Sequence, residues 1–117
     1  MTTAHQDLYA LLSGAPGVTA LVQTRITPGV ASQDTTVPYI TYQAISDVNA
    51  NALDTNVKIG SNVRIQINCW AASPDVATQL ADEVEAALTT GYVIFRREDR
   101  DEETERFRTL VDWKVWK

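Results

Sequence analysis

The chain has 117 residues and a mass of 12.9 kDa, which suits one domain spanning residues 1–117. Its 44% hydrophobic and 21% charged residues are typical of a folded globular chain and exclude disorder over the whole length. The net charge of −5 argues against nonspecific duplex binding as the main role. No apolar run approaches the ~20 residues of a membrane-spanning helix, so we expect no contact with a membrane.

Two helices are predicted in the first quarter of the chain. Leu8, Leu11 and Leu12 recur on one helical face. Pro16 then suits the start of a second, shorter helix. After that helix, residues 30–37 predict an irregular connection.

The spacing of apolar residues changes to two from Tyr39 onward. It is clearest from Asn62 to Trp70, where apolar and polar residues alternate as in a half-buried antiparallel strand. The apolar positions of this strand are Val63, Ile65, Ile67 and Cys69. Residues 47–61, between the two predicted strands, are rich in Asn and Asp and predict a long loop. We expect this loop to be mobile in the free chain and to become ordered against a neighbour.

A third helix is the best-defined predicted element. Ser73 suits its N-cap, Pro74 its first position and Gly91 its end. Its apolar side is formed by Val76, Ala77, Leu80, Ala81, Val84, Ala87 and Leu88.

The polar side of this helix is acidic. Asp82, Glu83 and Glu85 lie toward the C-terminus, where the helix dipole disfavours carboxylates. The helix itself supplies no Lys or Arg. We therefore expect either a partner surface here or a face that serves solubility. Neutralising these residues should leave the fold intact or slightly stabilise it.

Two further strands run from roughly Tyr92 to Arg97 and from Arg106 to Trp116. Residues 98–105 contain no apolar side chain and predict an exposed hairpin tip. The order α-α-β-β-α-β-β predicts an α+β fold, with a single antiparallel sheet of about four strands and helices packed on one face.

Residues of the types that catalyse reactions or bind metal ions are few in this chain. His5 is the single histidine and lies near a chain end, and Cys69 lies on the apolar face of its strand, where a buried structural thiol is favoured. A single cysteine also excludes an internal disulfide and a multi-cysteine zinc site. The acidic hairpin lacks the ligand spacing of a calcium loop. We expect no catalysis, no cofactor and no metal.

Three tryptophans remain to be explained. A stacking platform for single-stranded nucleic acid needs a basic groove, which this acidic chain does not offer. Trp113 shares the face of Val111 and Val115 and belongs to the core. Trp70 and Trp116 have the opposite parity, so they either cover the core at strand ends or anchor an interface.

The order of five short blocks resembles the small tail completion, or tail terminator, proteins of long-tailed bacteriophages. Three of these blocks are Val37-Pro38-Tyr39-Ile40-Thr41-Tyr42-Gln43, Val63-Arg64-Ile65-Gln66-Ile67-Asn68-Cys69-Trp70-Ala71 and Val111-Asp112-Trp113-Lys114-Val115-Trp116. The likeness covers essentially the whole chain. It implies a structural virion protein at the head-proximal end of the tail, assembled in the host cytoplasm.

The resemblance also implies a mode of action. The resemblance implies a subunit that forms a ring with itself, often a hexamer in this family, that caps the tail tube, stops its polymerisation and provides the head-joining surface. Its other partners are then the tail tube protein and a head-completion or connector protein, without sequence-specific nucleic acid. One alternative is a head-side neck or connector protein. Another is a small hydrolase or nucleic-acid module, which the absence of catalytic motifs disfavours.

Protein–protein contacts are expected on three surfaces, namely the Asn/Asp-rich loop, the acidic helix side and the charged hairpin. The expected contact residues are Asn49, Asn51, Leu53, Asp54, Val57 and Lys58 in the loop, Asp82, Glu83 and Glu85 on the helix, and Arg97, Asp99, Arg100, Asp101 and Glu102 in the hairpin.

Overall fold

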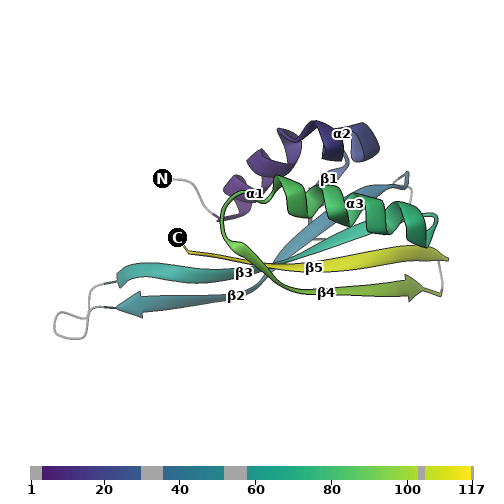
Figure 1. The fold of residues 1–117 in the computed structure, drawn as a ribbon. Helices are drawn as coiled ribbons and strands as arrows, with labels where there is room; N and C mark the ends of the chain where they lie inside the picture. The colour runs from purple at the N-terminus through teal and green to yellow at the C-terminus, as the bar shows by residue number, and fades with distance from the viewer. Residues whose placement is uncertain (1–3, 30–35, 52–57, 103–104, 117) are drawn as a thin grey trace.

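The computed structural model describes residues 4–29, 36–51, 58–102 and 105–116 (Figure 1). The elements in chain order are α1 (Ala4–Ser13), α2 (Pro16–Val22), β1 (Ile26–Pro28), β2 (Tyr39–Asn51), β3 (Lys58–Ala71), α3 (Pro74–Ala87), β4 (Tyr92–Asp101) and β5 (Arg106–Trp116). The strands form one sheet in the order β1-β2-β3-β5-β4, and all three labelled helices lie on one side of it (Figure 1). We call the opposite side the open face, because no described helix covers it.

The α+β class and the one-sided helix layer are as predicted, but the sheet has five strands and is mixed. β1 pairs parallel with β2, with Ile26 beside Ile40. The main-chain N–H of Gly29 then donates to the Tyr42 carbonyl at 2.8 Å. A three-residue strand is too short to display alternation, and its pairing depends on where the chain returns in space.

The predicted loop over residues 47–61 is wrong at both ends. β2 continues to Asn51 and β3 begins at Lys58, with Ala50 paired to Gly60. β5 accompanies β3 only as far as Asn62, so the outer part of this hairpin is a two-stranded ribbon. Such a ribbon has no third strand to impose apolar alternation, which is why the pattern was absent from the sequence.

The predicted hairpin tip over residues 98–105 is also too long. β4 continues to Asp101, where Asp101 pairs with Arg106. Cross-strand ion pairs replace apolar alternation in this part of β4, so periodicity alone places its end four residues too early.

The core lies between the helix layer and the sheet, as the apolar faces predict. Trp113 is fully buried, and its indole N–H donates to the Thr90 carbonyl at 2.8 Å. Other fully buried core residues are Leu8, Leu12, Val18, Val22, Ile40, Ile65, Ile67, Cys69, Leu80, Ala81, Val84 and Val111.

The start of α3 is as predicted, and its end is not. The Ser73 hydroxyl accepts the Val76 N–H at 3.3 Å, which confirms the N-cap. The helix ends at Ala87 with Leu88 as its C-cap. Gly91 instead forms the turn into β4 with a φ of +67°, and this backbone conformation favours glycine.

Candidate interaction surfaces

The acidic side of α3 is paired with an arginine from β4. Arg96 donates to Asp82 at 2.8 Å and to Glu85 at 2.6 Å, and it also donates to the Thr78 carbonyl at 3.3 Å. The helix supplies no basic residue of its own, as noted from the sequence, but β4 supplies one to Asp82 and Glu85. The signal is invisible in the helix sequence, because the guanidinium comes from the next strand.

Glu83 is placed differently from its two acidic neighbours. Its carboxylate lies against α2, where a Cβ added at Gly17 would overlap it. Of the three predicted contact residues on α3, Asp82 and Glu85 thus share Arg96, while Glu83 faces the other helix.

Neutralising the paired carboxylates is expected to destabilise the fold. Asp82→Asn with Glu85→Gln removes both ionic partners of Arg96, whose side chain is only 27% exposed. We expect a loss of about 1–2 kcal/mol in the free energy of unfolding, mostly from Glu85, since hydrogen bonds to charged groups contribute at that level.

Urea unfolding measures this effect, with Glu83→Gln as the matched control that removes one charge without touching Arg96. The control should unfold near the wild-type midpoint. Equal midpoints for all three proteins would contradict the stabilising role of the Arg96 cluster.

Asp99 is the centre of the charged β4–β5 hairpin. It accepts the Arg100 main-chain N–H at 2.8 Å and the Arg108 guanidinium at 2.6 Å, and Arg97 lies at 3.9 Å. These interactions, led by the Arg100 N–H, lower the pKa of Asp99 below its ordinary value. The Arg100 guanidinium lies over the Phe107 ring at 5.8 Å. The hairpin therefore neutralises much of its own charge. Of the other two predicted residues here, Asp101 is half-buried and Glu102 is exposed.

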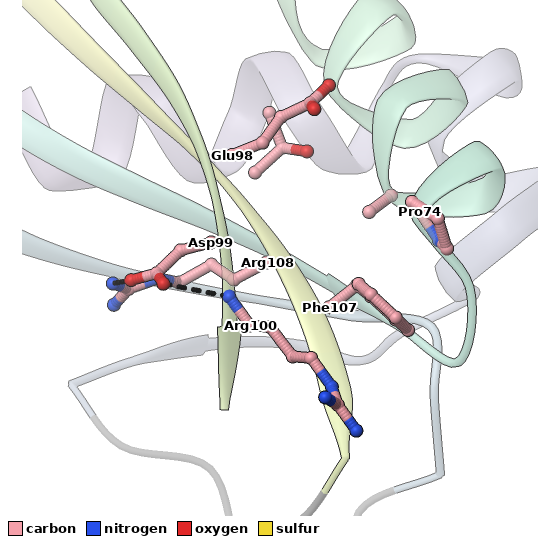
Figure 2. A pocket seen from close by; sticks show the side chains of 8 residues that line it. Pro74, Glu98, Asp99, Arg100, Phe107 and Arg108 are labelled. Atoms are coloured by element: carbon pink, nitrogen blue, oxygen red, sulfur yellow. Dashed lines mark hydrogen bonds and ion pairs between the residues drawn. The ribbon is translucent and has the colours of Figure 1, made fainter. Parts of the chain in front are cut away.

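A hollow of about 320 Å³ lies between the start of α3 and the β4–β5 hairpin (Figure 2). Pro74 lines it from the start of α3, and Phe107 and Arg100 line it from the hairpin. Glu98 extends toward α3, where it accepts the Thr78 hydroxyl at 3.0 Å. Thr109 also lines the hollow and is 1% exposed, and its hydroxyl oxygen has no hydrogen-bond partner in the described chain. The hollow is large enough to accept a side chain.

Cys69 and His5 do not form a reactive pair. Cys69 is fully buried, and desolvation raises the pKa of its thiol to about 12. The His5 ring lies 6.0 Å from that of Tyr42. Within the described residues, no group of three His, Cys, Asp or Glu side chains could hold a metal ion.

The raised thiol pKa gives a prediction for both reactivity and pH dependence. In the folded protein, Cys69 should resist a thiol reagent at pH 8 and react at once after unfolding in urea. The folded state holds this proton more tightly than the unfolded state, whose thiol titrates near 9. Its contribution to stability is therefore complete below about pH 9 and is lost as the pH rises toward 12.

The stability of Cys69→Ala should lack this component of the alkaline pH dependence, which is obtained by comparing the two proteins from pH 8 to 11. Rapid labelling of the native protein would contradict the buried position.

One end of the open face carries a row of aromatic and arginine side chains that sequence reasoning did not foresee. The Tyr39 and Trp70 rings stack with centroids 6.0 Å apart. The Arg108 guanidinium lies 5.4 Å from the Trp70 ring, and Arg106 lies 5.4 Å from that of Tyr39. The Trp70 indole N–H also donates to Thr41 at 3.3 Å. Trp70 thus packs against side chains of its own chain. The sequence did not predict these contacts, because they depend on the register between neighbouring strands.

The other end of the open face has exposed aromatic side chains. Tyr92 is 56% exposed, Phe95 is 48% exposed and Trp116 is 52% exposed. Trp116 was one of the two anchors considered from the sequence, whereas Tyr92 and Phe95 were missed. A bulge between Val93 and Phe95 breaks the alternation that would have placed them.

The structure describes three of the six contact residues predicted in the loop. Asn49 and Asn51 lie in β2, and Lys58 begins β3. Leu53, Asp54 and Val57 lie outside the described residues.

Comparison with known proteins adds a family and a fold. A family model described as "Tail completion protein gp17" matches residues 6–116. A solved chain from the "Virion of native gene transfer agent (GTA) particle" superimposes with a TM-score of 0.72 at 19% sequence identity, covering 93% of this chain and 90% of that one. No curated protein sequence matches the chain. Among the described residues, no helix is long and apolar enough to cross a membrane.

Proposed function

Because the chain belongs to the tail completion protein gp17 family, it is a structural protein of the virion tail, and we propose that it is the tail terminator. In this role, six copies of the chain form a ring that caps the tail tube and stops its polymerisation. The ring then offers the surface to which the head-completion or connector protein binds.

The observation that carries the proposal is the family match over residues 6–116, which spans the whole fold from α1 to β5. A chain from a gene transfer agent virion has a similar fold, and this likeness supports a role in a particle. We propose that the protein acts through protein contacts alone, without catalysis, cofactor or membrane. The three surfaces predicted from the sequence remain candidates for these contacts.

Electron microscopy of particles made with and without this chain tests the proposal. Without it, we expect tail tubes of irregular, excessive length that do not join to heads, and the purified protein should restore uniform tails. Its elution volume at high concentration should correspond to about six copies rather than to a 12.9 kDa monomer.

A head-side neck or connector role predicts a different result. In that case tails made without the protein have normal length, and the purified protein binds portal-bearing heads rather than tail tubes. Normal tails that also join heads normally would exclude both roles.

A further inference from the structure

An exposed apolar surface lies where β4 and β5 meet at one end of the open face. We call it the aromatic end and define it by Tyr92, Phe95 and Trp116. In the strand register, Tyr92 lies opposite Lys114 and Phe95 opposite Asp112, and Trp116 follows on the same face as both partners. About half of each aromatic side chain is exposed. β4 is also an edge strand, paired only with β5 among the described strands. Exposed aromatic side chains gathered at a sheet edge are typical of an interface.

A second apolar surface lies in the helix layer, on the other side of the sheet. It is a shallow hollow of about 410 Å³ beside α1, and we call it the α1 hollow. Among the described residues, Ala10 and Leu11 provide apolar walls, and Asp7 and Thr90 also line the hollow. Tyr9, which precedes Ala10 in α1, is 44% exposed.

We propose that the aromatic end of one copy docks into the α1 hollow of the next copy around the ring. This inference rests on the ring of the proposed function and names the surfaces that build it. A contact between two different surfaces of the same chain repeats head to tail, and such contacts generate rings when the rotation closes.

Charge favours this pairing over a two-fold contact. Lys114 pairs with Tyr92 across the strands and lies two residues before Trp116, and Asp7 lines the α1 hollow. Head-to-tail docking brings these opposite charges together. In a two-fold contact of the aromatic end with itself, the cross-strand carboxylate Asp112 is only 2% exposed and already paired with Arg64. Opposite charges across an interface fix its orientation, and like charges opposite each other are costly. A Trp anchor seated in an apolar hollow is a common source of interface energy.

Cysteine cross-linking in the full chain tests which surfaces meet. Asp7→Cys and Lys114→Cys are made as separate proteins, each with the native Cys69 left in place because it is fully buried. We expect a disulfide-linked dimer when the two proteins are mixed and oxidised, and none from either protein alone. The double variant should give a ladder up to the ring size. Replacing Lys114→Cys by Arg97→Cys, on the charged half of β4, is the matched control and should not cross-link.

Dimers from Lys114→Cys alone would indicate the two-fold contact and overturn the proposal. Intact rings without any mixed dimer would overturn it too, while leaving the tail terminator function standing. Absence of rings from the wild-type protein at all concentrations would instead count against the proposed ring itself.

Trp116→Ala provides the second measurement. We expect at least a tenfold rise in the concentration needed for ring assembly, with the monomer's thermal unfolding unchanged because the side chain is half exposed. Normal assembly of Trp116→Ala together with loss of tail binding would show that another protein occupies the aromatic end, and this result would overturn the proposal.

Discussion

Ile65→Asp and Leu80→Asp are each expected to abolish folding rather than to alter assembly alone. Ile65 lies in β3 between Ala44 of β2 and Trp113 of β5, and Leu80 lies on the buried side of α3. Both side chains are fully buried. An unpaired charge at such a site has an effective penalty of several kcal/mol, against a total stability of about 5–15 kcal/mol for a domain of this size.

Circular dichroism and urea unfolding of the purified variants measure the effect. Gln79→Asp is the matched control, because it introduces the same carboxylate at an exposed position next to Leu80. We expect this control to unfold cooperatively near the wild-type midpoint. If either core variant remained soluble, cooperative and ring-forming, the assignment of the core to the helix-facing side of the sheet would be wrong.

The sequence was informative wherever burial on one face controls residue choice. The alternation through Val63, Ile65 and Ile67 and the apolar side of α3 predicted the core, and Ser73 predicted the start of that helix. Each of these signals is local, because a strand or helix that buries one side displays its own period in the sequence.

The differences arise where partners are distant in sequence. Arg96 reaches Asp82 and Glu85 only because β4 returns along α3, and β1 becomes a strand only because β2 runs beside it. No pattern within the helix or within three residues can reveal such pairings.

The residues of the candidate interface were likewise predictable only where the signal is local. Trp116 was noticed because its parity differs from the core positions of β5. Tyr92 and Phe95 were missed because the bulge between Val93 and Phe95 interrupts the period. Their proximity to Trp116 depends on the β4–β5 register, which the charged hairpin did not reveal.

Gly91→Ala is expected to have the second large effect, on the turn that leads from α3 into β4. At a φ of +67°, an L-residue is strained. The added Cβ would also overlap the Lys114 carbonyl oxygen and lie 2.8 Å from the Trp113 indole nitrogen. That nitrogen holds the same turn through Thr90, so neither neighbour can move freely. We expect a loss of about 2–4 kcal/mol in unfolding free energy, the sum of backbone strain and overpacking.

Gly29→Ala separates the two causes of that loss. Gly29 also has a positive φ, +78°, but a Cβ there would meet no atom within 4 Å. It should therefore show only the backbone strain, about 1–2 kcal/mol. Urea unfolding of the two variants, with equal m-values, gives the difference directly. Because Tyr92 follows Gly91, Gly91→Ala should also weaken ring assembly, while Gly29→Ala should not. Equal destabilisation of both variants would mean that the turn does not press against β5, and the placement of the aromatic end beside Lys114 would lose its structural basis.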